Sequence, residues 1–349
     1  MDLQSALAPM GQGAEQIAHL FRWMAWGAAA IWAAVTALLL YSIHGRRRLR
    51  DEHQARLLII GGGIVFPALV LTTLLTYGLA LLPDLLAAAP PGSVRIEVTG
   101  EQWWWRVRYP SGHTHIELAN ELRLPAGEHV ELELRAADVI HSLWIPSLGG
   151  KTDMIPGRTT RMRLGPSRSG VYRGVCAEYC GASHALMALD VHVVPREQFD
   201  AWLAAQARPA AGPHDGAGGE VAAADHGDAG AAARGGAGTA ATGGDAAARG
   251  GDLFHLYGCG ACHTVRGTPA RGQVGPDLTH VASRRVLAAG TISHASHTGA
   301  LHRVPDRRAA LKQWIARSES LKPGVHMPAF DMLDERELDA LAAYLEGLR

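Results

Sequence analysis

Two thiols, an imidazole and a thioether lie on one short stretch of this chain. Cys176 and Cys180 are followed by His184 and Met187, at intervals of four, four and three residues. A second histidine, His141, lies upstream in the sequence Ile-His-Ser-Leu-Trp-Ile-Pro. Soft sulfur together with imidazole is a donor set that suits copper. The presence of two cysteines rather than one suggests that both sulfurs bridge a pair of copper ions.

A second metal signature follows near the C-terminus. It reads Cys259-Gly-Ala-Cys262-His263, which is the attachment signal for a c-type haem. The chain has four cysteines in all. Each of the two sites therefore uses two cysteines, and none remains for a disulfide.

Other uses of these cysteines stay open on the residues alone. The first pair could form a disulfide, or could join the two histidines around a structural zinc. A zinc site has no use for Met187, and a short loop disulfide does not need the histidines. For the second signature the alternative is coincidence.

Most of the chain resembles known electron-transfer proteins. Residues 20 to 200 resemble subunit II of the haem–copper cytochrome c oxidases, and residues 251 to 349 resemble a small class I cytochrome c. Together they resemble the caa-type oxidases, in which subunit II carries a fused cytochrome c. Besides the copper loop, the matching motifs are Gly100-Glu-Gln-Trp-Trp-Trp105, His141-Ser-Leu-Trp-Ile-Pro146 and Lys151-Thr-Asp-Met-Ile-Pro-Gly-Arg158.

The resemblance implies the binuclear copper centre called CuA, in which both cysteine sulfurs bridge both metals. His141 and Met187 would complete one copper, and His184 with the backbone carbonyl of Glu178 would complete the other. In the family, the carboxylate that matches Glu178 also reaches a magnesium or manganese ion at the interface with subunit I. The alternative is a solvated carboxylate whose carbonyl alone has a role.

Trp103 matches the family's surface tryptophan, where electrons enter on the way to CuA. It begins a run of three tryptophans in a strand-like stretch, in which residues 103 and 105 face one way and residue 104 the other. Packing of the sandwich and of the membrane interface is the alternative role for these side chains.

The cytochrome part of the resemblance assigns the haem attachment. Cys259 and Cys262 would add across the haem vinyl groups, and His263 would be the proximal ligand. Pro276, in Gly275-Pro-Asp-Leu278, matches the residue whose carbonyl orients this histidine from outside the ligand set.

The sixth iron ligand must come from elsewhere in the chain. The segment Lys322-Pro-Gly-Val-His-Met327-Pro-Ala-Phe330 resembles the methionine loop of cytochrome c, which favours Met327. His326 and Met332 are the rivals, and Met332 lacks the flanking prolines. A methionine and histidine pair raises the reduction potential, which suits an acceptor of electrons from another cytochrome.

Two apolar runs near the N-terminus predict a membrane anchor. The runs from Trp23 to Tyr41 and from Leu57 to Leu82 are each long enough to cross a bilayer. A short basic segment between them, Gly45-Arg-Arg-Arg-Leu-Arg50, predicts a cytoplasmic loop. Both termini and both redox domains would then lie on the outer, periplasmic side of a bacterial cytoplasmic membrane. The formal net charge is zero, so no global field argues for nucleic acid as a partner.

We therefore expect a multidomain membrane protein. Residues 1–91 would carry a hairpin of two transmembrane helices, at about 20–43 and 57–82. Residues 92–205 alternate polar and apolar side chains over short runs, which predicts an all-β sandwich, and the resemblance makes it cupredoxin-like. Residues 206–250, almost wholly Ala, Gly, Asp, His and Arg, predict a flexible linker. Residues 251–349 predict an all-α cytochrome c domain, with helix starts at Asp306 and at a capping box of Asp334 and Glu337.

The function implied by the resemblance is electron entry into a terminal oxidase. Soluble or membrane-bound cytochrome c would reduce the fused haem c, and CuA would pass the electron to the haem of subunit I. Oxygen would be reduced there to water with proton translocation, and the implied partners are subunit I, with its haem and CuB, and subunit III. Two alternatives stay open: the CuA-bearing subunit of a nitric oxide reductase, and a membrane-anchored copper chaperone. A quinol oxidase subunit II is a poorer match, because those proteins have lost the copper ligands that this chain has.

Overall fold

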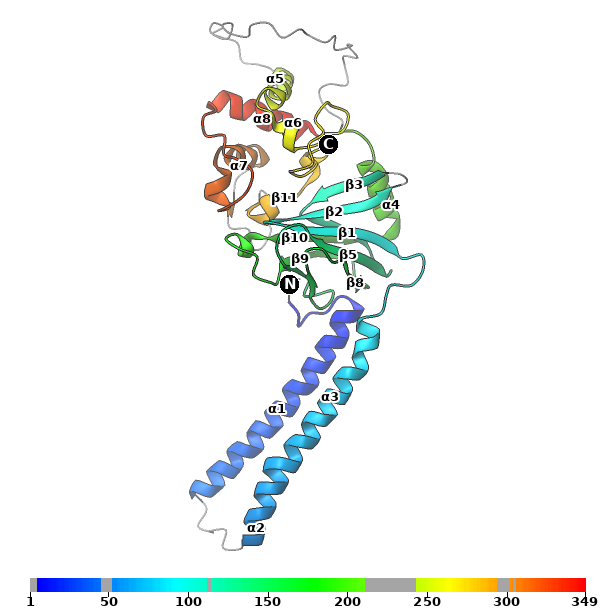
Figure 1. The fold of residues 1–349 in the computed structure, drawn as a ribbon, viewed down its shortest axis with the longest axis vertical. Helices are drawn as coiled ribbons and strands as arrows, with labels where there is room; N and C mark the ends of the chain where they lie inside the picture. Colours follow the sequence, from blue (N-terminus) through cyan, green and yellow to red (C-terminus); the bar gives the residue numbers. More distant parts are fainter. Residues whose placement is uncertain (1–4, 45–51, 112–113, 211–242, 294–301, 304–305) are drawn as a thin grey trace.

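The computed structural model describes residues 5–44, 52–111, 114–210, 243–293, 302–303 and 306–349. Three parts follow one another along the long axis of the molecule (Figure 1). They are a helical hairpin, a β-sandwich and a small helical domain at the far end. The last two parts are in direct contact, so the order of the parts along the chain is also their order in space.

The hairpin consists of two long, apolar helical segments that lie side by side (Figure 1). The first is α1 (Gln12–His44). The second is continuous from Glu52 to Leu85 and comprises α2 (Glu52–Leu57), a π-helical stretch (Leu58–Val65) and α3 (Phe66–Leu85). Both segments are long and apolar enough to cross a membrane, and the most apolar window of each is unburied.

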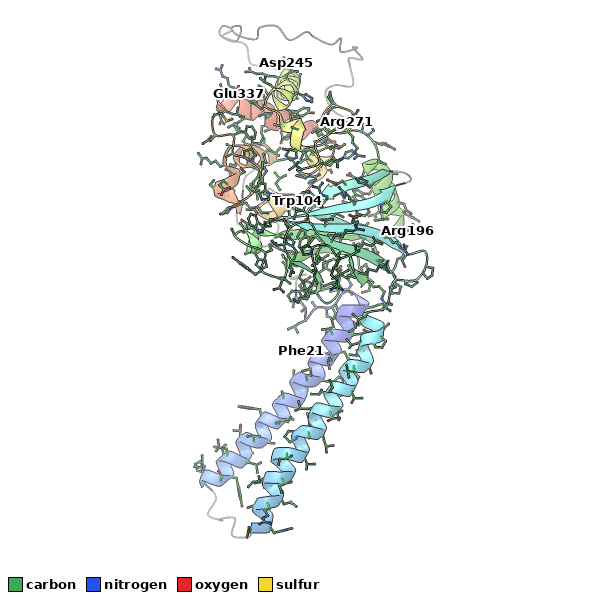
Figure 2. All side chains as sticks on the ribbon, in the orientation of Figure 1. Phe21, Trp104, Arg196, Asp245, Arg271 and Glu337 are labelled. Atoms are coloured by element: carbon green, nitrogen blue, oxygen red, sulfur yellow. The ribbon has the colours of Figure 1, made fainter. Side chains whose placement is uncertain are left out.

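The outward side chains of the hairpin explain why it needs a bilayer. Phe21, Trp26 and Trp32 are 52%, 74% and 71% exposed, and Phe21 projects clear of the rest of the molecule (Figure 2). An apolar surface of this extent on a soluble chain would drive association. The predicted hairpin of two long apolar helices is confirmed, and its helices extend beyond the predicted bounds at both ends.

The sandwich is built from two five-stranded sheets. The first sheet has the order β3 (Thr114–Ala119), β2 (Trp104–Ser111), β1 (Val94–Glu101), β5 (Val130–Ala136) and β8 (Thr160–Leu164). The second has the order β4 (Glu121–Pro125), β10 (Ala188–Val194), β9 (Gly170–Cys176), β6 (His141–Trp144) and β7 (Thr152–Met154). One core of Ile, Val, Leu and aromatic side chains fills the space between the sheets.

Alternation of side chains explains why these segments form strands. In β1, Ile96 and Val98 are fully buried, while Glu97 between them is partly exposed. The same pattern recurs at Leu132 and Leu134 of β5. Because successive side chains of a strand point to opposite faces, such runs can bury one face and solvate the other. The β-sandwich predicted from the alternating runs is confirmed.

The hairpin contacts the sandwich through the segment before α1 and the C-terminal end of α3. The backbone N–H of Met10 donates to Ser147 at 2.7 Å, and Gly11 pairs with Pro166 in an isolated β-bridge. At the other helix, Arg163 forms an ion pair with Asp84. The sandwich therefore lies directly against the end of the hairpin.

The C-terminal region is mainly helical, as predicted. Its longer helices are α5 (Gly243–Leu256), α7 (Arg307–Leu321) and α8 (Glu335–Gly347), with α6 (Cys259–Cys262) as a single turn. The side chain of Asp306 caps α7, and Asp334 with Glu337 forms the predicted capping box of α8. A small sheet of two-residue strands, β11 (Val286–Leu287), β12 (Ile292–Ser293) and β13 (His302–Arg303), was not predicted.

The predicted linker is shorter than expected at both ends. Residues 211–242 lie outside the described part of the chain. The helix α4 (Arg196–Gln206) includes the first predicted linker residue, and α5 begins at Gly243. A Cβ on Gly250 would lie 1.9 Å from the carbonyl oxygen of Ala340 in α8. Glycine there lets the two helices cross closely, so tertiary packing makes a helix of a segment whose composition disfavours one.

Candidate copper and haem sites

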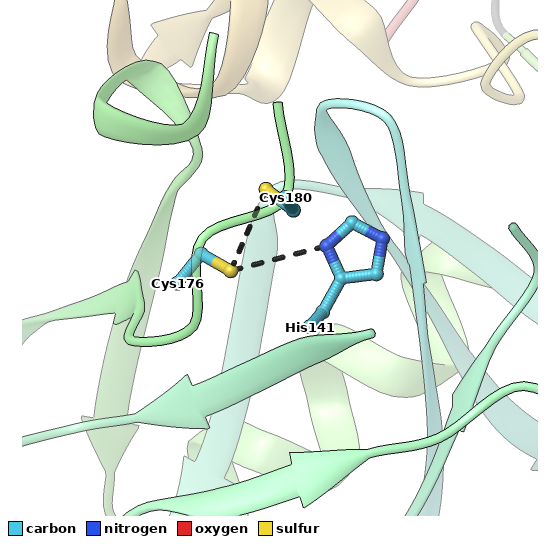
Figure 3. A group of neighbouring side chains, drawn as sticks. All are labelled: His141, Cys176 and Cys180. Atoms are coloured by element: carbon cyan, nitrogen blue, oxygen red, sulfur yellow. Dashed lines mark hydrogen bonds between the residues drawn. The ribbon is translucent and has the colours of Figure 1, made fainter. Parts of the chain in front are cut away.

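Strand pairing brings the predicted copper ligands together at one end of the second sheet. Strand β9 ends at Cys176, and β10 begins one residue after Met187. The two strands are antiparallel, so the intervening loop returns on itself, and the N–H of Cys176 donates to the carbonyl of Met187 at 3.2 Å. Strand β6 pairs with the other edge of β9, with Leu143 opposite Cys176, and this pairing places His141 beside the loop (Figure 3).

The two cysteine sulfurs and His141 form the centre of the site (Figure 3). The Sγ atoms of Cys176 and Cys180 are 3.8 Å apart, and the Nδ1 of His141 is 3.8 Å from the Sγ of Cys176. All four cysteines of the chain are free. A disulfide needs about 2.05 Å between its sulfurs. At the observed separation, a metal ion between the sulfurs could lie within about 2.3 Å of both, a usual metal–thiolate distance.

The three other predicted donors surround these sulfurs. The Nδ1 of His184 is 3.5 Å and the Sδ of Met187 is 4.0 Å from the Sγ of Cys180. The carbonyl oxygen of Glu178 is 3.2 Å from the Sγ of Cys176. A structural zinc uses four ligands and does not recruit a thioether. This larger, softer donor set fits a pair of copper ions better than one zinc ion.

Burial and the carboxylate of Asp138, which the sequence did not predict, determine the protonation and the orientation of His141. The imidazole is fully buried, and its Nε2 lies 2.8 Å from Oδ1 of Asp138. Burial alone would lower the pKa of His141, but the hydrogen bonds to Asp138 and Cys176 outweigh it and raise that pKa to about 9. Asp138 also leaves Nδ1 directed at the sulfur, which is how a carboxylate commonly orients a histidine ligand. The sequence signal for Asp138, an acid three residues before a histidine, is weak on its own.

The two thiols share one proton without metal. The hydrogen bond from Cys180 is the main reason that the pKa of Cys176 falls to about 3, and the same interaction raises the pKa of Cys180. One sulfur is therefore a thiolate at neutral pH and the other a thiol. The thiolate is the form that binds metal.

We expect copper binding to tighten as the pH rises from about 6 to about 9. Below pH 9 the metals must displace one proton from His141, whose pKa is about 9, and one from the Cys180 thiol. Two released protons correspond to an apparent affinity that rises about a hundredfold per pH unit below pH 9, and about tenfold per unit above it. Calorimetric titration in buffers of different ionisation enthalpy measures the released protons directly. An affinity that does not change with pH would contradict this protonation state.

We expect Met187→Leu to retain copper but to shift its reduction potential and slow electron transfer. The thioether is a weak ligand whose identity tunes the potential of a copper site. Met187 is 1% exposed, and leucine is close to it in volume, so the cost in stability should stay under about 1.5 kcal/mol. Copper content and redox potentiometry test this expectation. Loss of all copper would show that Met187 is needed to hold the metal.

Trp103 lies against the copper loop rather than on the open surface. Its side chain is 6% exposed, and its indole Nε1–H donates to the carbonyl of Cys180 at 3.0 Å. The amide of Gln102 donates to the same carbonyl at 2.7 Å. The structure thus brings Trp103 into direct contact with a predicted copper ligand, while its part in electron transfer stays a prediction.

The Glu178 side chain points away from the sulfurs. Its carboxylate lies 3.3 Å from the Nζ of Lys151, which also lies 3.2 Å from Asp153. About half of each of these side chains is exposed. In the described chain the carboxylate therefore belongs to a surface ion pair, and only the carbonyl of Glu178 faces the copper ligands.

The two cysteines of the haem signature lie on a single helical turn, and the histidine that follows is hydrogen-bonded to a backbone carbonyl. Helix α6 spans Cys259–Cys262, and Nδ1 of His263 lies 2.8 Å from the carbonyl oxygen of Pro276. This contact leaves Nε2 for a metal, and burial lowers the pKa of His263, which favours the neutral, ligating imidazole. A Cβ on Gly275 would lie 2.5 Å from the ring, so the Gly275 backbone packs against the imidazole. The structure brings together His263 and Pro276 as the sequence predicts.

Burial separates the three candidates for the sixth ligand. Met327 is partly buried against the core of the helical domain, and its carbonyl accepts a hydrogen bond from Ser318 at 2.9 Å. Met332 is 70% exposed. His326 is also exposed, and its ring lies near Trp103, with the ring centroids 6.5 Å apart. These environments favour Met327, which stays our predicted ligand.

Comparison with known families agrees with both sites. Residues 111–194 match the periplasmic domain of cytochrome C oxidase subunit II, and residues 247–349 match cytochrome c. The first match contains the whole copper loop and His141, and the second contains the haem signature.

Individual relatives are similar to this chain over about three quarters of its length. The chain is 34% identical over 258 residues to cytochrome c oxidase subunit 2 of Alkalihalophilus pseudofirmus, and 29% identical over 267 residues to that of Bacillus sp. PS3. Each alignment covers 74% of this chain but only 62% and 63% of the two relatives, so the chain spans less than two thirds of their length.

Among solved structures, one similar chain is the periplasmic domain of subunit II of the cytochrome oxidase of Bradyrhizobium japonicum. It is 29% identical, with 34% of this chain and 96% of that one covered and a TM-score of 0.32. The matched families and the two sites lead to one assignment. The chain combines the periplasmic domain of a cytochrome c oxidase subunit II with a C-terminal cytochrome c domain.

Proposed function

We propose that this chain is the electron-entry subunit of a terminal cytochrome c oxidase. An external cytochrome c reduces its haem c, and the electron continues through CuA to the haem of subunit I, where oxygen is reduced to water with proton translocation. Subunit I, with its haem and CuB, and subunit III are the proposed partners. The observation that carries the proposal is the convergence of six copper donors in a chain that also has a cytochrome c domain.

The geometry of the donors supports electron transfer rather than metal storage. The two sulfurs lie 3.8 Å apart and, with the surrounding donors, would hold a pair of copper ions. Such a pair would supply one-electron transfer with a small reorganisation. The Sγ atoms lie in a buried site between β-strands that hold the ligands in place. A chaperone would instead need open ligands that release copper.

Membrane orientation is part of the same proposal. The two spans, the basic segment between them and the match to a periplasmic domain support a bacterial cytoplasmic membrane protein with both redox domains outside. We also propose that the Glu178 carboxylate exchanges its ion pair with Lys151 for a magnesium or manganese ion when subunit I is present. Carboxylate oxygens are the ligands that these hard cations prefer.

Low-temperature EPR of the oxidised full chain, loaded with copper and haem in detergent, tests the proposal. A signal with hyperfine structure from two equivalent copper nuclei would support a mixed-valence CuA pair. A single-copper signal, or none, would contradict it and favour a copper chaperone or a structural metal site.

The reaction of the complex separates the two remaining functions. The complex purified with its partner subunits should consume oxygen when reduced cytochrome c is supplied. Turnover of nitric oxide without oxygen consumption would instead identify the chain as the entry subunit of a nitric oxide reductase.

A further inference from the structure

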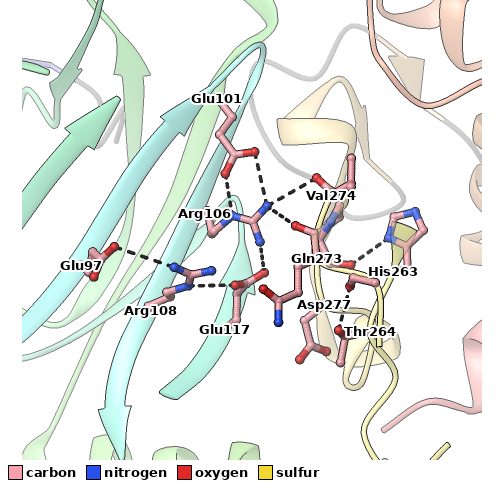
Figure 4. Close-up of polar contacts among 12 residues, drawn as sticks. Glu97, Glu101, Arg106, Arg108, Glu117, His263, Thr264, Gln273, Val274 and Asp277 are labelled. Carbon is pink, nitrogen blue, oxygen red and sulfur yellow. Dashed lines mark hydrogen bonds and ion pairs between the residues drawn. The ribbon is translucent and has the colours of Figure 1, made fainter. Parts of the chain in front are cut away.

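The cytochrome domain touches the copper domain through a set of polar contacts beside both redox sites. One of these is made by Arg106 of β2 (Figure 4). Its guanidinium is fixed by Glu101 and Glu117 at 2.5 and 2.6 Å, and donates to the carbonyl of Gln273 at 2.9 Å. Gln273 lies close to the segment that holds His263, as Figure 4 shows. The contact is therefore formed by a preorganised, nearly buried cation, not by a mobile surface side chain.

Lys322 makes the contact nearest to the copper loop. It follows α7 directly, it is 2% exposed, and its Nζ donates to the carbonyl of Leu186 at 3.1 Å. The same Nζ donates to the carbonyl of Ala288 in its own domain, also at 3.1 Å. A buried amine is tolerated only where its hydrogen-bonding needs are met. Because Leu186 precedes Met187, this lysine ties the cytochrome domain to the chain beside a predicted copper ligand.

The segment after Lys322 covers Trp103. The Oγ of Ser183, in the copper loop, donates to the carbonyl of Pro323 at 2.7 Å. A Cβ on Gly324 would lie 2.7 Å from the indole ring of Trp103, so the Gly324 backbone packs directly against that ring. Gly324 also has a φ of +78°, which a side chain would strain. The indole is thus enclosed between the copper loop and the segment that leads to Met327.

We propose that Lys322 and Gly324 form a specific intramolecular dock that holds the cytochrome domain on the copper domain and closes Trp103 to any separate electron donor. A donor protein can then engage only the cytochrome domain, and Trp103 faces the chain's own haem-binding segment. Lys322 is a positioning residue, since its amine bonds backbone carbonyls and it is not one of the predicted metal ligands. The electron-transfer consequence rests on the proposed function, but the dock itself does not.

Hydroxyl-radical footprinting of the full chain, with copper and haem bound, tests the dock. Oxidation of Trp103 is compared with that of Trp104, which lies one residue away and is partly exposed. Trp103 in the wild type should be oxidised several-fold more slowly than Trp104. Lys322→Met removes the hydrogen bond between the domains, so the ratio of docked to undocked forms should fall about tenfold and most of the protection of Trp103 relative to Trp104 should be lost.

Lys312→Met is the matched control. Lys312 lies on α7 of the same domain and pairs with Glu335 within that domain, so its loss should leave Trp103 protected. Gly324→Ala provides a second disruption that does not depend on the lysine, and it should also expose Trp103. Haem and copper absorption spectra confirm that each variant has folded.

Failure of the dock and failure of the proposed function would give different experimental results. Equal oxidation of Trp103 and Trp104 in the wild type, or protection that survives both Lys322→Met and Gly324→Ala, would overturn the dock. A protected Trp103 in a protein that lacks the two-copper EPR signal would leave the dock intact and contradict only the proposed function.

Discussion

The Cys176→Ser variant should lose the two-copper EPR signal altogether. Its Sγ lies 3.8 Å from both the Cys180 sulfur and the His141 Nδ1, and 3.2 Å from the Glu178 carbonyl. Removing this sulfur therefore removes the donor that lies next to three of the other predicted copper donors. Substituting a residue that only orients a metal ligand lowers metal affinity about 10–100-fold. Removing a bridging thiolate should therefore lower copper affinity more than about a hundredfold. Copper content and EPR of the loaded full chain measure the effect.

Cys259→Ser is the reciprocal control for this experiment. Cys259 lies in the haem signature on α6 of the other domain, so its loss should prevent complete covalent haem attachment and leave the copper signal unchanged. A two-copper signal that survives Cys176→Ser would refute the bridging arrangement. Loss of copper from Cys259→Ser as well would show that the two sites are not independent.

Gly100→Ala should have the second largest effect, although Gly100 is not a ligand. A Cβ at this position of β1 would lie 2.8 Å from Cδ2 and 2.9 Å from Cγ of His141. The imidazole is fully buried and held by Asp138, so it has no free space to move into. Forcing it aside should cost about 1–3 kcal/mol in stability, as for other overpacked cores, and about 10–100-fold in copper affinity, as for lost ligand orientation.

Gly150→Ala is the matched control for Gly100→Ala. Its Cβ would meet only the Cδ1 of Ile17, at 3.4 Å, which is ordinary van der Waals contact. Thermal unfolding of the metal-free chain measures the change in stability, and copper titration measures the change in affinity. If Gly100→Ala binds copper as tightly as Gly150→Ala does, His141 is not confined as the structure indicates.

The sequence by itself determined the chemistry of this protein. A metal site is specified by ligand types and their spacing, and both can be counted along the chain. The loop from Cys176 to Met187 and the signature ending at His263 are local, so the structure needed only to close each one. Alternation in β1 and the capping box at Asp334 are also local signals, and both predictions were confirmed.

Only the tertiary structure decided which residues support these ligands from a distance. Asp138 orients His141 because the turn before β6 folds back on the ring, and Gly100 restricts it because β1 passes behind. Helix α5 extends into a segment whose composition predicts a linker, because Gly250 allows close packing against α8. For Gly100 and Gly250 the relevant energy comes from contacts between residues far apart in sequence, and for Asp138 it depends on how the turn before β6 folds; local propensity contains neither.

The position of the cytochrome domain is the clearest example. In the sequence, Lys322 only begins the segment that resembles a methionine loop, and Trp103 only matches a surface tryptophan at which electrons enter. Folding buries Lys322 between two carbonyl oxygens from different domains and covers Trp103 with the Gly324 backbone. The cost of burying the Lys322 amine and the covering of the Trp103 ring both depend on contacts that exist only in the assembled interface. The sequence predicts the ligands of the two redox centres, and the packing between the domains determines where the two centres lie relative to each other.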